Sequence, residues 1–383
     1  MDNDKIRIAV VGLGFGSEFP QIYADHPNVE YVGICDVDVK RLNDCGDLHR
    51  IERRHSNIED VLGSDDYDTV HLCTPLHSHA QLTLAALRSG KHCACAVPMG
   101  TSLNELREII DAERETGLRY MMMETQVYSH HYFYVQALHE AGEFGRIQFM
   151  RTHDYHDMEG FADWWRGLPP MHYATHAVSP LLAITQSEAT SVRCLGSGVM
   201  SQEYTQIYGN PYPIETALFT IDAGYDLAME ATVSRFATSR DSMESFSIYG
   251  EAASFEWQME LELPVLFRMS KELKKNGHGR QITHERVTPP ETSKLLPAEI
   301  RKYTRHEVIP DPANPHIPLL LGHAHHGSHP HMVHEFVRSI IENRPSRIDA
   351  PTAAQWTAPG ICAHESAMGG GMIVKIPSYS PTE

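Results

Sequence analysis

The sequence predicts an α/β protein in which a doubly wound parallel sheet is followed by an α+β domain with an open, mainly antiparallel sheet. Its 383 residues exceed what one small core needs, since about 150 residues per domain is usual. Near-continuous apolar segments alternate with helical segments in the first third of the chain, whereas longer segments of alternating polarity follow. We therefore expect domains at residues 1–126 and 127–383.

Short apolar segments rich in β-branched residues predict buried strands in the N-terminal part. They lie at 5–11, 29–36, 68–75, 92–97 and from Tyr120 onward. Helical patterns separate them, most clearly at 79–90 and 102–117, where Ser102 followed three residues later by Glu105 predicts a capping box. Apolar strands separated by helices are typical of a parallel sheet that helices cover on both faces.

The pattern changes in the C-terminal part. A helical segment at 132–142 precedes segments in which polar and apolar residues alternate, at 147–155, 191–200, 216–224, 227–237 and 244–258. Alternation with period two predicts a mostly antiparallel sheet with one solvent-exposed face. Residues 271–318 show no clear periodicity and are expected to be a surface excursion, after which helical patterns return at 331–344 and 349–370.

Composition and charge exclude several classes of protein. Hydrophobic residues make up 42% and charged residues 21%, as in ordinary globular proteins, and the net charge of −18 repels nucleic-acid backbones. No stretch approaches about 18 consecutive apolar residues, and the N-terminus lacks a signal region. Seven cysteines without zinc-site or redox spacing fit a reducing compartment. We expect a cytoplasmic protein that binds neither nucleic acid nor membrane.

A glycine-rich turn directly follows the first predicted strand. In the fingerprint G-x-G-x-x-G, Gly12 and Gly14 take the first two positions, while Ser17 stands at the third and Gly16 lies one residue earlier. Small residues at both places keep the geometry possible. The backbone N–H groups of Phe15, Gly16 and Ser17 would then open a helix toward a pyrophosphate.

An acidic residue follows at the expected distance. Asp36 ends the second predicted strand, 22 residues after Gly14. A carboxylate there accepts a hydrogen bond from the ribose 2′-hydroxyl and repels a 2′-phosphate. Strand, turn, helix, strand and acid occur in the order of a Rossmann unit, so we favour NAD over NADP as the cofactor. The alternative is a structural glycine turn and a solvated aspartate.

These segments resemble the glucose-fructose oxidoreductase/inositol dehydrogenase (Gfo/Idh/MocA) family along essentially the whole chain. The markers are VVGLGFG, ICDVD, LCTPLHSHAQLTLAAL, GKHCACAVPM and GRIQF. The resemblance implies a Rossmann domain, an open-sheet domain and a sugar or polyol at the nicotinamide. It also implies cofactor contacts at Thr74, Pro75, His77, His79 and Val97.

Two departures from the family pattern change the expected chemistry. After the fourth strand the family usually has Glu-Lys-Pro, whose lysine orients substrate and relays protons, but Val97 occupies the lysine position here. The usual Asp-x₃-His-x₂-Asp pattern, aligned on His176, begins with His172 and ends with Ser179. The lysine and both aspartates of the usual proton relay are therefore absent.

The segment Met171–Pro180 resembles the NAD-dependent glycoside hydrolase branch of the family, the α-N-acetylgalactosaminidase type. That branch has a Tyr-x-Thr-His-x-x-x-Pro pattern and a valine in place of the catalytic lysine. The matching residues are Tyr173, Thr175, His176, Pro180 and Val97. Glu124 and Tyr128 are similar to a further segment of that branch, which implies contacts with substrate.

The branch resemblance implies hydrolysis without net oxidation. A hydride leaves sugar carbon 3 and later returns, and the transient ketone acidifies carbon 2, so that loss of its proton expels the glycosidic oxygen from carbon 1. His176 is the expected base for the hydroxyl group, because imidazole titrates near neutral pH. Tyr173 is the expected base at carbon 2, and His172 supports either. The structural alternatives are hydrogen-bonded histidines and a tyrosine that only packs.

Three arginine residues are further candidates for contacts with cofactor or substrate. Trp165 and Arg166 resemble a Trp-Arg element that reaches over the cofactor in relatives, with an exposed amphipathic turn as the alternative. Arg235 and Arg240 are expected to be surface charges, and a contact with an anionic substrate group is the alternative.

The histidine-rich segment 322–336 suggests a wall of the substrate pocket at His326 or His329. A metal site and a solvated loop are the alternatives, and we expect no metal, because glycine and proline interrupt the segment and hydride transfer in this fold needs none. The resemblance also implies a homodimer or homotetramer. Three functions stay open: an NAD-dependent glycoside hydrolase, a conventional sugar dehydrogenase or reductase, and a non-enzymatic NAD-dependent sensor.

Overall fold

The protein forms two compact units. In a computed structural model, the described residues are 4–240, 242–259, 262–305, 307–309, 319–321 and 324–379. The first unit comprises Met1–His130, Glu291–Ala354 and Tyr379–Glu383, and the second comprises His131–Pro290 and Gln355–Ser378. The chain leaves the first unit close to the expected boundary at residue 126. The chain returns to the first unit at Glu291. A division into two consecutive domains at one boundary does not include this return.

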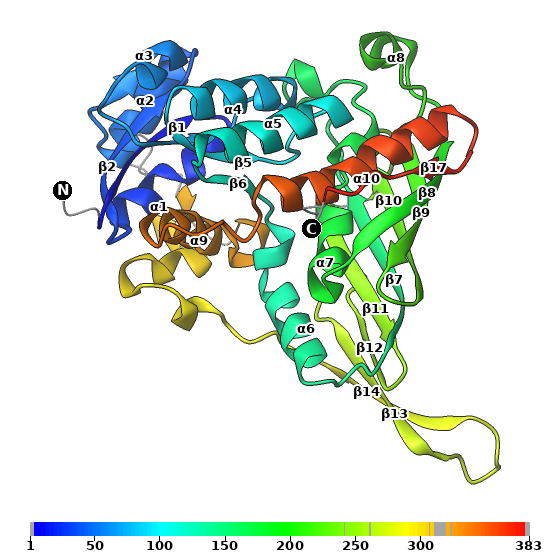
Figure 1. Ribbon diagram of the computed structural model, residues 1–383. Coiled ribbons are helices and arrows are strands. Elements are labelled where there is room, and N and C mark those ends of the chain that lie inside the picture. Colours follow the sequence, from blue (N-terminus) through cyan, green and yellow to red (C-terminus); the bar gives the residue numbers. More distant parts are fainter. Residues whose placement is uncertain are drawn as a thin grey trace. The chain divides into compact units, whose positions relative to one another are not determined.

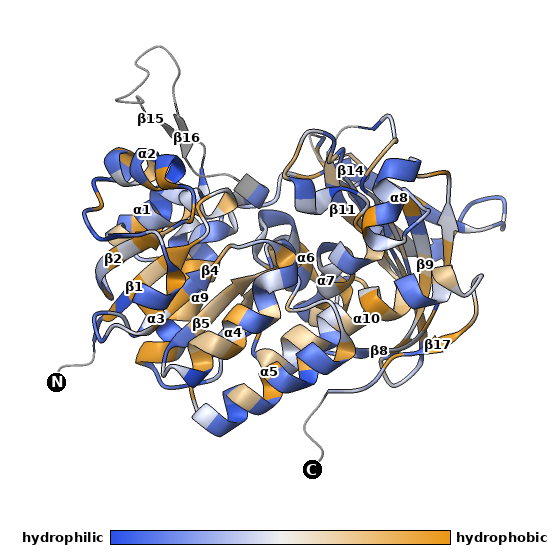
Figure 2. Ribbon diagram, turned by 90° about the horizontal axis from the view of Figure 1, so that it is seen from above, coloured by the Kyte–Doolittle hydropathy of each residue, from blue (hydrophilic) through white to orange (hydrophobic). Residues whose placement is uncertain are grey.

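The first unit holds a six-stranded, wholly parallel sheet in the order β3-β2-β1-β4-β5-β6 (Figure 1). Its strands are β1 (Ile6–Val11), β2 (Val29–Cys35), β3 (Arg54–His55), β4 (Thr69–Leu72), β5 (His92–Ala96) and β6 (Tyr120–Met123). The prediction of a doubly wound sheet is confirmed, with β3 as a short additional edge strand. Hydrophobic colouring runs along β1 and β5, which are buried between helices (Figure 2).

Helices cover this sheet. They include α1 (Pro20–Asp25), α2 (Val39–His49), α3 (Ile58–Leu62), α4 (His79–Arg88), α5 (Leu103–Thr116) and α9 (His329–Ile341). Helices α4 and α5 lie side by side, as Figure 1 shows. The predicted capping box of α5 is confirmed, because Ser102 Oγ accepts from Glu105 N at 3.3 Å and Glu105 Oε2 accepts from Ser102 N at 2.9 Å.

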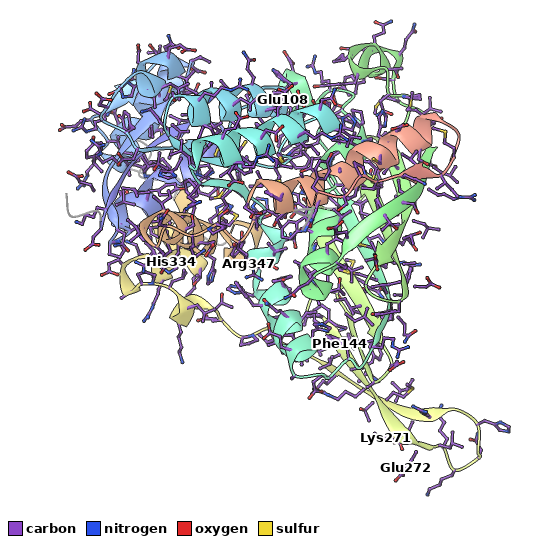
Figure 3. All side chains as sticks on the ribbon, in the orientation of Figure 1. Glu108, Phe144, Lys271, Glu272, His334 and Arg347 are labelled. Atoms are coloured by element: carbon purple, nitrogen blue, oxygen red, sulfur yellow. The ribbon has the colours of Figure 1, made fainter. Side chains whose placement is uncertain are left out.

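Hydrogen bonds explain why residues after 290 belong to the first unit. Tyr303 Oη donates to Asp25 at 2.6 Å, and the imidazole nitrogens of His26 and His334 lie 3.0 Å apart. Figure 3 labels His334 on α9. These contacts fix α9 and the segment before it against the region of α1, a tertiary pairing that no local sequence pattern predicts.

The second unit holds a nine-stranded sheet in the order β14-β13-β12-β11-β7-β10-β9-β8-β17. Its strands are β7 (Ile147–Tyr155), β8 (Glu188–Ser197), β9 (Ile214–Asp222), β10 (Asp226–Ser234), β11 (Met243–Gly250), β12 (Ala253–Glu256), β13 (Val265–Leu273), β14 (Arg280–Arg286) and β17 (Val374–Lys375). The pairing is antiparallel except between β7 and β10, which are parallel. The predicted mainly antiparallel sheet is confirmed.

Further helices accompany this sheet. They are α6 (His130–Glu140), α7 (Thr175–Thr185), α8 (Gln202–Tyr208) and α10 (Ala350–Met368). Helix α7 packs against the neighbouring strands β7, β10 and β11, so it lies over one face of the sheet. The β13–β14 hairpin projects from the second unit with Lys271 and Glu272 toward its tip (Figures 1 and 3). The end of β13 and all of β14 lie within residues 271–318. The expectation that this whole segment is irregular is therefore wrong for these two strands.

Candidate functional site: a dinucleotide turn and an aromatic cluster

The glycine-rich turn has a distinct steric reason at each glycine. Gly12 has a φ of +86°, and a Cβ there would lie 2.6 Å from the carbonyl oxygen of Cys73. A Cβ at Gly16 would lie 2.9 Å from Cys73 Cβ, whereas one at Gly14 would meet no atom within 4 Å. Gly16 therefore meets the need for close packing that the fingerprint assigns to its third glycine, and Gly14 leaves open space for a phosphate.

The carboxylate of Asp36 is fixed at the end of β2. Its Oδ2 accepts from Leu13 N at 2.7 Å, its Oδ1 accepts from Asp38 N at 2.8 Å, and Arg41 Nη1 lies 3.2 Å from Oδ2. These bonds tie the acid to the glycine-rich turn and hold it in one orientation. The open space at Gly14 fits a pyrophosphate, and the anchored carboxylate of Asp36 fits the hydroxyl groups of an adenosine ribose. The residues present therefore fit NAD.

The loops after β4 and β5 are joined by His79. Its Nδ1 lies 2.8 Å from the carbonyl oxygen of Pro98, and its Nε2 lies 2.7 Å from that of Thr74. Both nitrogens must donate, which requires the charged imidazolium. Burial lowers the pKa of His79, but Cys95 and the two carbonyl groups raise it further, to about 9.

The other predicted contacts in these loops are more accessible. Thr74 and Pro75 are half-buried and His77 is exposed, whereas Val97 is buried. Thr74 Oγ1 accepts from Ser78 Oγ at 2.9 Å. His79 is thus placed to hold the two loops together, which distinguishes it from the accessible residues that a cofactor would touch directly.

His329 packs on the glycine-rich turn. Its ring lies 5.5 Å from the Phe15 ring and 4.7 Å from the Phe19 ring, and its Nδ1 lies 3.2 Å from Glu18 Oε2. Burial raises the pKa of Glu18, but the hydrogen bond and charge of His329 lower it further. His326 is half-buried, with a φ of +54°. Residues 322 and 323 of the histidine-rich segment lie outside the described residues.

Glu124 and Tyr128 lie just beyond β6 and are both buried in the first unit. Glu124 Oε1 accepts from Gln126 N at 2.9 Å. The guanidinium carbon of Arg347 lies 5.6 Å from the centre of the Tyr128 ring. Arg347 was not among the predicted site residues, and it comes from the returning segment after residue 290.

In the second unit, three predicted residues form an aromatic cluster of Trp165, Tyr173 and His176. The Tyr173 ring lies 4.9 Å from the Trp165 ring and 5.5 Å from the His176 ring, edge to face in both cases. His176 lies in the first turn of α7 and is 6% exposed, and Tyr173 is half-buried. The cluster brings an imidazole and a phenol together, as two neighbouring proton-transfer groups require.

His172 points into a different environment. Its ring lies 4.9 Å from the ring of His364, whose Nδ1 lies 2.7 Å from the buried carboxylate of Glu215. Burial, together with the nearby His364, lowers the pKa of His172 to about 3. A histidine with this pKa is neutral and weakly basic at pH 7, which supports a structural role more than proton transfer.

Arg166 is half exposed and pairs with two acids. Its guanidinium lies 3.4 Å from Asp163 and 3.9 Å from Glu203. Trp165, by contrast, is buried and stacks on Trp164, with ring centres 4.2 Å apart. The Trp-Arg element thus places its tryptophan inside the aromatic cluster and its arginine on the surface of the second unit.

The expectation that Arg235 is a surface charge is wrong, because this residue is fully buried. Its Nη1 and Nη2 donate to the two carboxylate oxygens of Asp154 at 2.7 and 2.5 Å. His156 Nδ1 lies 3.0 Å from Asp154 Oδ1, and His156 Nε2 lies 3.5 Å from Glu244 Oε1. We call Asp154, His156, Arg235 and Glu244 the Arg235 network. These residues lie far apart in the sequence, so no local sequence pattern predicts the network.

The Arg235 network is also the group of described residues with the spacing of a metal site. Ligand atoms of Asp154, His156 and Glu244 all lie within 4.8 Å of one another. Both oxygens of Asp154 are occupied by the guanidinium of Arg235, however, and a cation beside a cation is unfavourable. The arrangement is that of a buried ion-pair network.

Comparison with known proteins identifies the first unit. Residues 6–124 match the model of the Gfo/Idh/MocA oxidoreductase family, described as having an NAD-binding Rossmann fold. The family resemblance that the sequence motifs predicted is thus confirmed for residues 6–124, and the matching family model describes an NAD-binding Rossmann fold, so NAD is the cofactor that the comparison supports.

Relatives carry different names. The chain is 27% identical over 203 residues to a glycosyl hydrolase family 109 protein of Saccharopolyspora erythraea, which covers 47% of this chain and 44% of that protein. It is 27% identical over 180 residues to a 4-carboxy-2-hydroxymuconate-6-semialdehyde dehydrogenase of a Sphingobium species, which covers 45% and 57%. The matched residues thus span about half the length of these curated relatives.

Solved structures confirm the fold of the chain. The structure of a levoglucosan dehydrogenase in complex with NADH has a TM-score of 0.76 at 18% identity and covers 98% of this chain and 100% of that one. At this identity the likeness concerns the fold alone. Among the described residues, no helix has both the length and the apolar character needed to cross a membrane.

Proposed function

We propose that the protein is an NAD-dependent enzyme that hydrolyses a glycoside without net oxidation. The observation that carries this proposal is the aromatic cluster combined with Val97: an imidazole and a phenol lie ring to ring, while the position of the family's catalytic lysine holds a buried apolar residue. A conventional relay through that lysine is unavailable to this chain. The glycosyl hydrolase name of several relatives supports the same proposal.

The chain's own residues then divide the proton transfers. His176 accepts the proton of the hydroxyl group at sugar carbon 3, and Tyr173, as phenolate, accepts the proton of carbon 2. Bound NAD⁺ supplies a reversible hydride acceptor for carbon 3. Loss of the carbon 2 proton forms a carbon 1–carbon 2 double bond and expels the aglycone, which takes up a proton. Water then adds to carbon 1, and a proton returns to carbon 2. Carbon 3 finally regains its hydride and its oxygen regains the proton held by His176, so that the sugar leaves without net oxidation.

Other predicted residues have roles that rest on the same proposal. Glu124, Tyr128, Trp165 and Arg166 would orient sugar or cofactor. Pairs of carboxylic acids, as in ordinary glycosidases, are not needed for this route. We also propose a homodimer or homotetramer, because the outer face of the nine-stranded sheet exposes Leu195 and Leu218.

Hydrolysis of aryl glycosides in D₂O tests this function. We expect release of the aglycone without accumulation of NADH, and deuterium at carbon 2 of the sugar product. A product that carries only solvent-derived hydroxyl and no deuterium at carbon 2 would rule out elimination. The Tyr173→Phe variant should abolish both signals while NAD binding stays unchanged.

A conventional NAD-dependent sugar dehydrogenase is the second candidate. The semialdehyde dehydrogenase relative matches this chain at the same 27% identity as the hydrolase relative, so sequence identity supports this candidate as well. The same assay separates the two, since a dehydrogenase forms one NADH per sugar and leaves the glycosidic bond intact. Neither product across a broad panel of sugars would instead indicate an NAD-dependent sensor.

A further inference from the structure

The Arg235 network lies where the parallel pairing of β7 and β10 meets β11. Asp154 of β7 is the register partner of Val233 and of Glu244, and Arg235 directly follows β10. Asp154, Arg235 and Glu244 are buried. Two carboxylates and a guanidinium are costly to remove from water, and such networks are weak contributors to stability. A role beyond stability is therefore the better explanation of their presence.

Arg235 also contacts the aromatic cluster. Its Nη2 donates to the carbonyl oxygen of Tyr173 at 3.2 Å, and its guanidinium carbon lies 5.4 Å from the centre of the Tyr173 ring. One side chain thus holds the Tyr173 backbone and places a positive charge beside its phenol ring. Within the described part of the chain, Arg235 Nε has no hydrogen-bond partner, so the network does not use all donors of the guanidinium.

We propose that Arg235 is the positioning residue of Tyr173, and that Asp154, His156 and Glu244 orient its guanidinium so that the phenolate form of Tyr173 is favoured. This inference deepens the proposed function and rests on it, because it explains how a phenol becomes a base for carbon 2. Arg235 itself touches no reacting atom in this scheme.

The electrostatic reason is direct. Burial lowers the pKa of Arg235, but the charge and hydrogen bonds of Asp154 raise it further, and the interaction with Tyr173 adds to this increase. Arg235 is therefore always a cation. A cation that interacts with a phenolate stabilises the phenolate by the same amount, which lowers the pKa of the phenol. Asp154 limits this effect, because its negative charge neutralises part of the field of Arg235.

The surroundings of Tyr173 define what else affects its titration. The titratable or charged groups that the described contacts place against its ring are Arg235, beyond β10, and His176, on α7. Trp165 contributes an uncharged ring. Behind Arg235 lie the carboxylates of Asp154 and Glu244, bridged by His156. Protonation of His176 acts in the same direction as Arg235, so His176→Asn serves as a background in which Arg235 is tested alone.

The test is a spectrophotometric pH titration of tyrosine ionisation in the NAD-bound full-length protein. The difference between the wild type and Tyr173→Phe isolates the titration of Tyr173. We expect its midpoint below the usual value of about 10. Arg235→Met should raise this midpoint by at least about one pH unit, and Arg235→Lys, which keeps the charge, should restore part of the decrease.

Variants that shift the Tyr173 midpoint in opposite directions distinguish an electrostatic effect from a loss of local structure. Asp154→Asn removes a negative charge behind Arg235 and should lower the Tyr173 midpoint, and Glu244→Gln should do so more weakly. Arg151→Met breaks an exposed ion pair with Glu230 on the same two strands and should leave the midpoint unchanged. If Arg235→Met fails to fold, Glu244→Gln and Arg235→Lys carry the test.

The titration of Tyr173 tests this inference in the absence of substrate. A wild-type Tyr173 that titrates near its ordinary value overturns it, and so do Arg235 and Asp154 variants that shift the midpoint in the same direction. The proposed function fails separately, through the absence of deuterium at carbon 2. In an active enzyme, Arg235→Lys should move the limb of the pH–rate profile that reports Tyr173 to higher pH, with little change in KM.

Discussion

At the scale of single residues, steric contacts decide which small residue has which role in the cofactor turn. The fingerprint places Ser17 at the third position, yet Gly16 is the glycine at this end of the turn that packs closely against Cys73. Sequence spacing alone left both residues as candidates, because it does not show which backbone atom approaches the neighbouring strand. Asp36 directly follows β2, as the strand pattern predicted, but its bond to Leu13 N required the turn to fold back onto the end of β2.

Asp36→Ser should reverse the choice of cofactor. Without the carboxylate, the ribose hydroxyls lose their acceptor and Arg41, now 3.2 Å from Asp36, becomes available for a 2′-phosphate. We expect NAD affinity to fall at least about tenfold, or about 1.4 kcal/mol, and NADP affinity to rise, as measured by calorimetric titration. Asp44→Ser, which removes an exposed partner of Lys40, is the matched control and should change neither affinity.

His176, at the start of α7, and His172, just before that helix, should differ in their effects. His176→Asn should lower turnover by about 10² to 10⁴, as expected for loss of a general base. His172→Asn should leave the pH–rate profile between pH 5 and 9 unchanged, because the pKa of His172 is about 3 and its charge does not change in that range. A profile that shifts with His172→Asn would show that the imidazole of His172 takes part in proton transfer.

At the scale of secondary-structure elements, loops between strands and helices carry the contacts that patterns did not resolve. The helix patterns predicted α4 and α5 closely, and the cap of α5 proved correct to the atom. The local sequence did not predict that His79 joins the loops after β4 and β5. Its two carbonyl partners come from different loops, so its protonation state follows from the arrangement of β4 and β5 in the sheet.

The charge of His79 should make stability depend on pH. The folded-state pKa of about 9 lies above the ordinary 6.5, so this contribution is fully present below pH 6.5 and is lost as the pH rises through about 9. Its size is on the order of 3 kcal/mol. Denaturant unfolding of the wild type and of His79→Gln should show a difference that shrinks between pH 7 and 9.5. A constant difference would mean that His79 is uncharged.

At the scale of the whole molecule, the division into two units predicts where a ligand acts. The glycine-rich turn and Asp36, on which the fit to the dinucleotide rests, both belong to the first unit. Binding of NAD at about 100 times its Kd should stabilise that unit by about 2.7 kcal/mol. In calorimetry, we expect the unfolding transition of the first unit to move to higher temperature.

Asp36→Ser provides the comparison for this measurement, because a tenfold loss of affinity at the same NAD concentration should reduce the stabilisation by NAD by about 1.3 kcal/mol. If NAD moved no transition in the wild type, the fit of the glycine-rich turn to the cofactor would be contradicted. A shift of similar size in wild type and variant would place the cofactor elsewhere.

The sequence by itself determined the class of both sheets, the glycine-rich turn after β1 with the acid after β2, and the resemblance of residues 6–124 to an NAD-binding family. These features depend on local periodicity and on short spacings within one strand–turn–helix segment. Only the tertiary structure decided the parallel pairing of β7 with β10, the burial of Arg235, and the return of residues 291–354 to the first unit. Each of these joins residues far apart in the chain, where long-range packing and charge pairing, rather than local pattern, lower the free energy.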